Sequence, residues 1–415
     1  MGTAKPQSTR LLEGLVIIMQ PLVVRAYTAA NCLGLGRNAL YAALRDRRSG
    51  LAPCGFEAVE LVTHIGQVPD AELTPLRSDL NDFECRNNRL AQLGMRQDGF
   101  EQAVARLRER YGAARIGVFV GTSTSGILQT EIAYRHRDAA TGALPPDFRY
   151  AHTHNNFSSA QFVQRYLGLT GPAVVVSSAC SSSAKVFANA QRMIAAGLCD
   201  AAVVGGVDSL CLTTLYGFNS LQLVSTRPCR PFDAERDGIS IGEAAGFVLL
   251  EKAGDGAAKN ELCLLGVGES CDAYHMSTPH PEGLGARLAM QSALNKAGLV
   301  TTDIDYINLH GTATRSNDAT EGLAIGNLFG GATPASSTKG WTGHTLGAAG
   351  IIEAIISMIA VEENFMPGSI NTEKLDATLA IDYLIDNRSA KVSRVMSNSF
   401  GFGGTNCSLI VGRLH

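Results

Sequence analysis

Charged residues and long apolar runs are both scarce in this chain of 415 residues. Charged side chains make up 18% of it, and 35 basic against 38 acidic residues give a formal net charge of -3. This balance argues against broad nucleic-acid binding through counterion release. The apolar run at 11–24 is interrupted by Glu13, Gln20 and Pro21 and is too short for a membrane-spanning helix. We expect a well-buried enzyme without a membrane partner.

The sequence also lacks the cysteine patterns of metal sites and disulfide frameworks. Its ten cysteines are scattered from Cys32 to Cys407 without a CxxC pair, so we expect neither a zinc site nor a disulfide scaffold. His152 and His154 have no third ligand nearby and are interpreted as loop or pocket residues. This cysteine usage favours the reducing cytoplasm.

No long linker or low-complexity segment divides the chain, and its length fits two domains or one large α/β unit. Short apolar runs alternate with helical patterns, which indicates βαβ units on parallel sheets. Helices are predicted at 181–196 and 346–363, where apolar residues recur at helical spacing. Strands are predicted at 22–25, 116–121, 173–177, 201–205, 246–251, 304–309, 336–338 and 392–397.

Two stretches of the sequence share one layout. VVVSSACSSSAKVF and ASSTKGWTGHTLGAAGIIEAI each contain a strand, a small-residue turn with a reactive side chain, and a buried helix. This similarity predicts an internal duplication. We predict an N-terminal extension at residues 1–20 and two similar halves at 21–256 and 257–415, divided at a glycine-containing turn.

Cys180 lies in SSACSSSA, directly after a strand and at the start of a predicted helix. A thiol at a helix N-terminus is close to unpaired backbone N–H groups, which favour the thiolate and lower its pKa. The small neighbours would let a substrate carbonyl approach. A buried structural cysteine is the usual alternative, but this context predicts a nucleophile.

Two histidines follow strands in the second half. His310 lies in INLHGTATRSND, and His344 lies in SSTKGWTGHTLGAAG together with Lys339. Strand ends are where open α/β sheets place functional residues, so a thiol and two imidazoles there suggest a nucleophile with acid/base partners. Glu353 follows His344 by about two and a half helical turns, and we expect it to form an ion pair with Lys339 that orients the histidines.

The segment SNSFGFGGTN, residues 397–406, combines phenylalanines with glycines. Glycines permit unusual backbone angles and expose N–H donors, which could stabilise an oxyanion. A tight turn near the C-terminus is the alternative. Phosphate binding is disfavoured because no GKS/T sequence follows.

Together with RPFDAERDGISIGEAAG, these motifs resemble the elongating β-ketoacyl-acyl-carrier-protein synthases of types I and II. The resemblance implies an α/β thiolase fold, in which two similar halves stack as five layers (αβαβα). It implies an acyltransferase that condenses a Cys180-bound acyl chain with the malonyl group of a carrier protein after decarboxylation. It implies no cofactor, because the carrier's phosphopantetheine arm delivers the acyl groups.

The resemblance also assigns roles to individual residues. Cys180, His310, His344 and Lys339 would be catalytic, with Glu353, Thr312 and Thr314 in support. The oxyanion site and gate would comprise Cys180, Phe400, Gly401, Phe402, Gly403 and Gly404. Thr124 would lie at the acyl pocket, where the family has a larger aliphatic residue, and Arg86 and Arg89 would bind the carrier protein.

Several functions remain open at this stage. A fatty-acid synthase is the first hypothesis, and a specialised ketosynthase of a polyene or polyketide pathway is the second. The resemblance implies a homodimer or a heterodimer with a related subunit. A silent chain-length subunit is disfavoured because the nucleophile and histidines are present. A thiolase is disfavoured because Cys407 lies outside the glycine-rich turn.

Overall fold

The computed structural model describes residues 18–72, 74–254 and 260–414. The predicted N-terminal extension, residues 1–20, lies mostly outside these ranges, and the predicted boundary between residues 256 and 257 lies wholly outside them. The division into two halves at that boundary stays a prediction.

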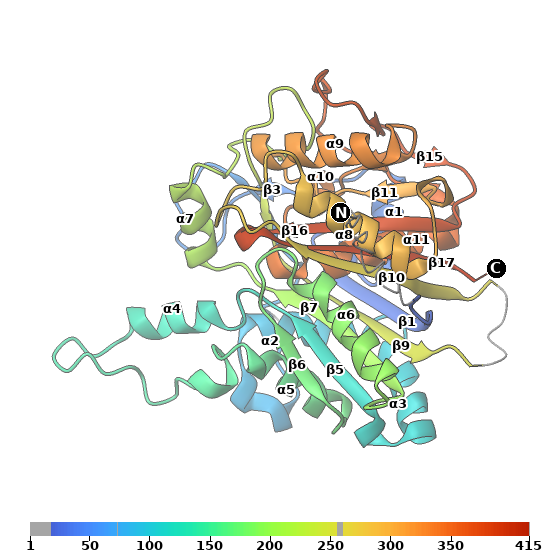
Figure 1. The fold of residues 1–415 in the computed structure, drawn as a ribbon. Helices are drawn as coiled ribbons and strands as arrows, with labels where there is room; N and C mark the ends of the chain where they lie inside the picture. Colours follow the sequence, from blue (N-terminus) through green and yellow to red (C-terminus); the bar gives the residue numbers. More distant parts are fainter. Residues whose placement is uncertain (1–17, 73, 255–259, 415) are drawn as a thin grey trace, which may run out of the picture.

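The main sheet has two groups of strands, one from each part of the chain (Figure 1). They meet where β1 pairs with β10, with Leu22 opposite Leu264 and Val23 opposite Cys263. The first group, in spatial order, is β1 (Leu22–Asn31), β9 (Ala244–Lys252), β7 (Ala201–Asp208), β5 (Ile116–Gly121) and β6 (Ala173–Val176). The second group is β10 (Leu262–Cys271), β17 (Thr405–Arg413), β16 (Arg394–Gly401), β11 (Tyr306–Asn308), β12 (Pro334–Ser336) and β14 (Asp382–Tyr383).

Short strands complete the β-structure. β2 (Gly34–Leu35) pairs with β1. A three-stranded sheet contains β3 (Ala52–Pro53), β4 (His64–Gly66) and β8 (Ile241–Gly242), and a two-stranded sheet contains β13 (Phe365–Met366) and β15 (Arg388–Ser389).

Helices cover both strand groups and fill the space between them. The middle layer contains α6 (Ser182–Ala195) and α11 (Ala349–Glu363), which contact each other and strands of both groups. The outer face of the first group carries α2 (Arg86–Met95), α3 (Phe100–Tyr111) and α5 (Phe157–Leu167), and the outer face of the second carries α8 (Leu284–Ala297) and α9 (Arg315–Phe329). The remaining helices are α1 (Arg37–Arg45), α4 (Ile127–Arg135), α7 (Leu212–Ser220) and α10 (Lys339–Thr342).

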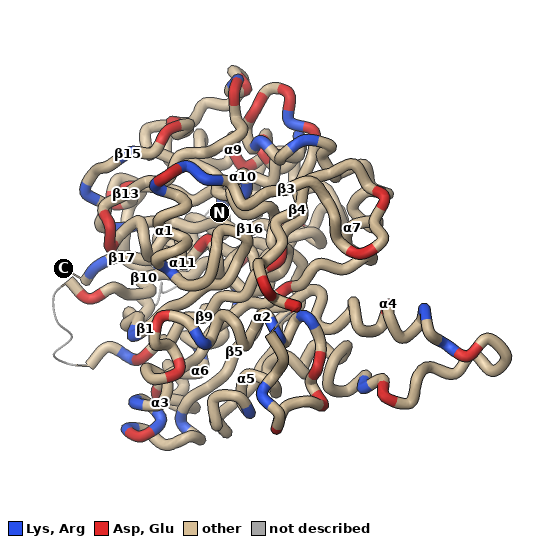
Figure 2. The backbone as a smooth tube through the Cα atoms, turned by 180° about the vertical axis from the view of Figure 1, so that it is seen from behind, with Lys and Arg blue, Asp and Glu red and all other residues tan. Residues whose placement is uncertain are grey.

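The position of α11 follows from its sequence. Its residues from Ala349 to Val361 are all buried and mostly apolar, as expected for a helix packed on every side. A Cβ on Gly350 would lie 2.6 Å from the backbone nitrogen of Ala184 in α6, so the two helices approach closely only because glycine is there. Charged residues lie mainly on the outer helices and loops (Figure 2).

The parallel strands direct the site residues toward one region. In the first group, β7, β5 and β6 are parallel, and β6 leads to Cys180. In the second group, β11 and β12 are parallel to β16, and they lead to His310 and Lys339. The carboxyl ends of parallel strands share one sheet edge, where α/β proteins place their sites.

One arm extends from the body of the molecule. It begins at α4 and continues through residues 136–156 before the chain returns at α5 (Figure 1). Tyr134 and Tyr150 in this arm are each 57% exposed. A search for helices that are long and apolar enough to cross a membrane finds none in the part of the chain that the structure describes.

Candidate active site

Cys180 is presented by a strained turn between β6 and α6. Ala179 has φ 50°, a left-handed conformation that residues other than glycine rarely adopt. Such strain is typical of functional sites. The helix begins only at Ser182, with Ser181 as its N-cap residue, so Cys180 lies just before the helix N-terminus.

The Cys180 thiol is buried, and this reverses the predicted change in its acidity. The residue is 5% exposed, and burial raises the pKa of its thiol to about 11, although Lys339 and the backbone N–H of Phe402 favour the thiolate. Desolvation therefore outweighs the neighbouring positive charge and the hydrogen bond. The thiol is neutral at rest.

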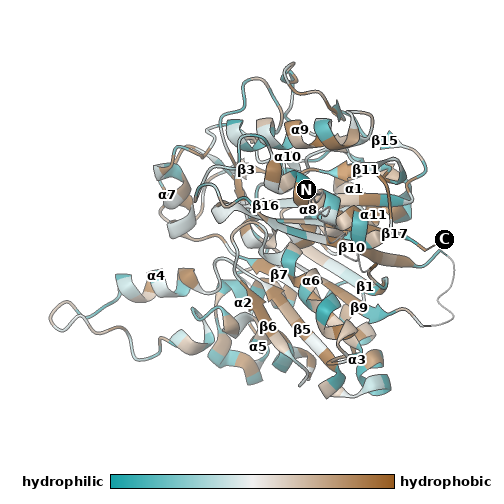
Figure 3. Ribbon diagram, viewed as in Figure 1, coloured by the Kyte–Doolittle hydropathy of each residue, from teal (hydrophilic) through white to brown (hydrophobic). Residues whose placement is uncertain are grey.

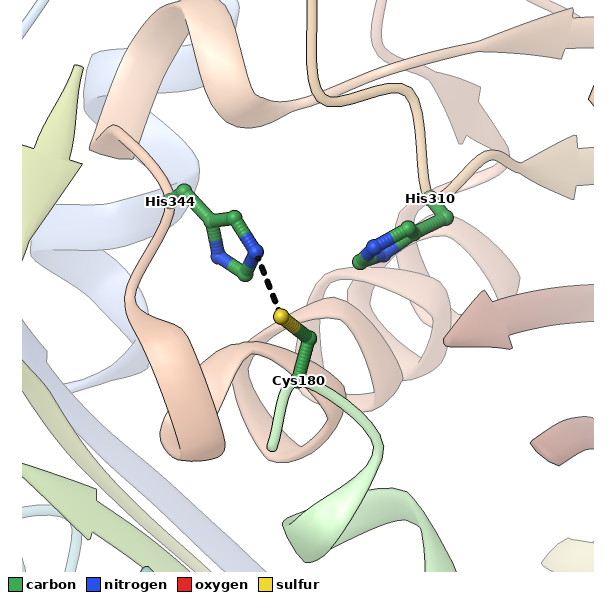
Figure 4. A group of neighbouring side chains, drawn as sticks. All are labelled: Cys180, His310 and His344. Carbon is green, nitrogen blue, oxygen red and sulfur yellow. Dashed lines mark hydrogen bonds between the residues drawn. The ribbon is translucent and has the colours of Figure 1, made fainter. Parts of the chain in front are cut away.

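His344 presents an N–H group to the Cys180 sulfur. The backbone N–H of Leu346 donates to Nδ1 of His344 at 3.1 Å, which places the proton of the neutral ring on Nε2. Nε2 lies 3.0 Å from Sγ of Cys180 (Figure 4). The tautomer of His344 is therefore fixed by the backbone two residues further on.

His310 is arranged in a similar way by a buried lysine. Nζ of Lys339 lies 3.3 Å from Nδ1 of His310 and also donates to the His310 carbonyl and to Glu353. An ammonium group only donates, so Nδ1 accepts and Nε2 of His310 carries the proton. The predicted ion pair between Lys339 and Glu353 is present.

Both imidazoles are neutral. Burial lowers the pKa of His310 and of His344 well below the usual value, and the charge of Lys339 lowers both further. The ligand atoms of Cys180, His310 and His344 lie within 4.8 Å of one another, and zinc binds such side chains. The ammonium of Lys339 and the Nε2 protons oppose a metal ion here, so we interpret the group as a nucleophile with two hydrogen-bond donors.

The three side chains line one cavity, together with Phe400, Phe402 and the glycines around them. Phe400 lies 6.0 Å from the His310 ring, and Phe402 lies 5.8 Å from the ring of Phe218, measured between ring centroids. Gly403 has φ 79°, and its N–H donates to the Met276 carbonyl at 2.7 Å. The glycine-rich turn thus forms one wall of the cavity.

The other predicted site residues differ in position. Thr312 and Thr314 line the cavity. Thr124 does not line it, and its buried hydroxyl group donates to Asp208 at 3.0 Å. Arg86 is 7% exposed and pairs with the buried carboxylate of Glu243, so it does not offer the free cation that the docking prediction requires. Arg89 is partly exposed and pairs with Glu84.

Several cavity residues were not predicted from the sequence. A loop after β10 contributes Asp272, His275 and Ser277, and α9 contributes Asn317. The DAYHM segment of this loop combines polar and aromatic residues after a strand, which is the one local signal that could have indicated it. Asp208 has no local signal, since its contacts join distant segments.

Comparison with known proteins identifies the family of this chain. The model of the β-ketoacyl synthase N-terminal domain matches residues 89–256, and that of the C-terminal domain matches residues 262–373. The 3-oxoacyl-acyl-carrier-protein synthase 2 of Coxiella burnetii (strain RSA 493 / Nine Mile phase I) is 33% identical over 95% of this chain and 98% of the relative. The chain belongs to the β-ketoacyl synthase family. It is an acyltransferase with 3-oxoacyl-acyl-carrier-protein synthase activity, and the reaction that it catalyses is a condensation.

Further relatives include both synthases and complexes. The 3-oxoacyl-acyl-carrier-protein synthase 2 of Rhizobium meliloti (strain 1021) is 38% identical over 72% of this chain and 74% of the relative. The ketosynthase ApeO in complex with its chain length factor ApeC, from Xenorhabdus doucetiae, is 38% identical with a TM-score of 0.85, covering 95% of this chain and 98% of that chain. This structural match confirms the predicted thiolase-like α/β fold.

Proposed function

We propose that Cys180 carries the acyl group during condensation and that His310 and His344 activate the malonyl substrate. The observation that carries this proposal is the convergence of the buried thiol with two neutral imidazoles whose Nε2–H groups are fixed by Leu346 and Lys339. The roles follow from this arrangement in two stages.

In the first stage, the sulfur of Cys180 attacks the thioester carbonyl of an acylated carrier protein. The carrier thiol leaves with the proton that Cys180 loses, and a new thioester remains on the enzyme. The backbone N–H of Phe402 favours negative charge on the sulfur, and it would donate to the oxyanion together with the N–H of Cys180. The N–H of His344 stabilises negative charge that develops on the sulfur.

In the second stage, a malonyl thioester occupies the cavity beside both histidines. Loss of CO₂ leaves an enolate, whose oxygen accepts hydrogen bonds from the two Nε2–H groups. The enolate carbon attacks the Cys180 thioester, a C–C bond forms and the thiolate leaves. Neutral donors suit this step, because a strongly acidic imidazolium would protonate the enolate before it could condense.

Intact-mass spectrometry with an acylated carrier protein tests the nucleophile. We expect one acyl adduct on the wild-type chain and none on Cys180→Ala, while His310→Ala and His344→Ala still acquire the adduct but do not condense it. An acyl adduct on Cys180→Ala would show that another residue is the nucleophile.

A specialised type II ketosynthase that works with a related subunit is the second candidate. The match to ApeO in complex with a chain length factor extends over 95% of this chain, and the ishigamide ketosynthase/chain length factor is a further match, with 27% identity. The same mass assay with saturated and conjugated acyl donors separates the candidates. Exclusive loading of conjugated chains favours the specialised pathway, and equal or better loading of saturated chains favours fatty-acid synthesis.

A partner subunit is also consistent with the exposed surface of the chain. β6 is the terminal strand at one end of the main sheet, and its four residues, AVVV, are only half-buried. An apolar edge strand tends to pair with another chain. We infer that this edge and the arm at 127–156 bind a second ketosynthase-type subunit, either another copy of this chain or a related one.

A further inference from the structure

Asp208 is a buried carboxylate that the mechanism above does not use. It is the last residue of β7 and is 0% exposed. Within the described part of the chain, its hydrogen-bond donors are all hydroxyl or backbone N–H groups, and burial raises the pKa of its carboxyl group. Burying a carboxylate without a neighbouring cation costs free energy, so the hydrogen bonds of Asp208 must compensate for this cost.

One oxygen of Asp208 binds the loop that follows β5. Oδ1 accepts from the backbone N–H groups of Ser123 at 2.8 Å and Thr124 at 3.0 Å. It also accepts from the hydroxyl groups of Thr122 and Thr124. These contacts fix Oδ1 within the first part of the chain, beneath the site.

The other oxygen reaches the second part of the chain. Oδ2 accepts from the backbone N–H of Gly347 at 2.6 Å and also from the hydroxyl group of Ser123. A Cβ on Gly347 would lie 2.7 Å from this oxygen, so the contact requires glycine. The preceding residue, Leu346, has φ 53°, which is strained for leucine and needs such an anchor.

The anchored turn is the one that determines the tautomer of His344. The N–H of Leu346, adjacent to Gly347, donates to Nδ1 of His344. The backbone of His344 is held separately, since its N–H donates to Ser240 and its carbonyl accepts from Gly242. Asp208 therefore acts on the imidazole ring through the turn at Leu346–Ala348 and not through the His344 backbone.

We propose that Asp208 is a positioning residue that anchors this turn and so keeps the Nε2–H of His344 directed at the reacting atoms. The inference rests on the role of His344 proposed above. Asp208 contacts both parts of the chain, so the orientation of the His344 ring depends on the loop at 122–124.

The variant Asp208→Asn tests this role with little change in shape. Its single acceptor oxygen would stay opposite the two backbone donors of Ser123 and Thr124, so its NH₂ group would face the Gly347 N–H, donor against donor. We expect kcat for malonyl decarboxylation to fall about tenfold or more. KM for the malonyl carrier protein should change by less than about twofold, and Cys180 should still be acylated.

A double-mutant cycle distinguishes positioning from simple destabilisation. If Asp208 acts through His344, adding Asp208→Asn to His344→Ala should not slow decarboxylation further. Glu251→Gln is the control, because Glu251 is also a buried carboxylate but lies opposite Ala201, at the far end of β7. Glu251→Gln should change the rate of decarboxylation by the same factor in the wild type and in His344→Ala.

Three results would overturn the proposal. An Asp208→Asn effect that is as large in His344→Ala as in the wild type would mean that Asp208 does not act through His344. Unchanged decarboxylation in Asp208→Asn, with a clear loss in His344→Ala, would refute the positioning role and leave the proposed function intact. Unchanged decarboxylation in His344→Ala would instead refute the proposed function and, with it, this inference.

Discussion

At the scale of single residues, Lys339 contributes to two parts of the site. It directs the proton of His310 to Nε2, and it neutralises Glu353, which is 3% exposed. Even with this partner, burial raises the pKa of Glu353 to about 7. The carboxylate is therefore poorly solvated, and its charge depends on the lysine.

Replacing Lys339 by methionine should destabilise the fold in a pH-dependent way. Breaking a buried ion pair costs about 3–5 kcal/mol. A Glu353 without a partner has a still higher pKa in the folded state, so the folded chain binds a proton that the unfolded chain has lost. The free energy of unfolding then falls as pH rises from the unfolded pKa to the folded one. The loss should be larger at pH about 8 than at about 5.5, as measured by urea denaturation.

The double variant Lys339→Met/Glu353→Gln provides the control for this prediction. It has no titrating carboxyl at position 353, so its free energy of unfolding should exceed that of Lys339→Met at pH about 8 and should vary less with pH. If Lys339→Met showed the same deficit at both pH values, Glu353 would not be the source of the instability.

The residues of the catalytic cluster could be predicted because each has a local signal. Cys180, His310 and His344 are reactive side chains that follow strands and precede small-residue turns, and the structure brings them together. The acidity of Cys180 was predicted wrongly, since burial depends on residues from distant segments. Asp208 and the loop at 272–279 were missed for the same reason.

At the scale of elements, the close contact between α6 and α11 can be tested at one residue. A Cβ at position 350 would meet the backbone of Ala184 at 2.6 Å, and backbone cannot move aside as a flexible side chain can. We expect Gly350→Ala to lower the free energy of unfolding by about 1–3 kcal/mol in urea denaturation.

Gly217→Ala is the matched control for this prediction. Gly217 lies in α7 with no atom within 4 Å of its added Cβ. Alanine has the higher helix propensity, so this substitution should be neutral or stabilising by up to about 1 kcal/mol. Equal effects at the two positions would indicate that the contact between α6 and α11 is not tight.

The helices and strands, like the site residues, could be predicted where the sequence carries a local signal. The predicted strand at 116–121 coincides with β5, because its apolar run is bounded by turn residues. β10 and β17 were not predicted. Both strands are largely buried, but polar residues such as Ser408 interrupt the apolar pattern that would have indicated them. The helix predicted from 346 starts at Ala349, because Leu346–Ala348 form the strained turn that contacts Asp208.

At the scale of the whole molecule, the hydrophobic strands of the first group lie next to an exposed arm (Figure 3). Tyr134 and Tyr150 on the arm are each 57% exposed. Tyrosines of this kind are enriched in the buried core of protein interfaces. The arm and the β6 edge belong to the same part of the chain, so one partner subunit could cover both.

Replacing both tyrosines by aspartate should weaken this association, because two charges would be buried without partners. We expect sedimentation velocity to show at least about a tenfold increase in Kd, whether the partner is a second copy or a related subunit. Val300→Asp is the control, since Val300 is 61% exposed and lies in the second part of the chain, between α8 and β11. An association that tolerates the arm substitutions as well as it tolerates the control would place the interface elsewhere, and the β6 edge would then need a different explanation.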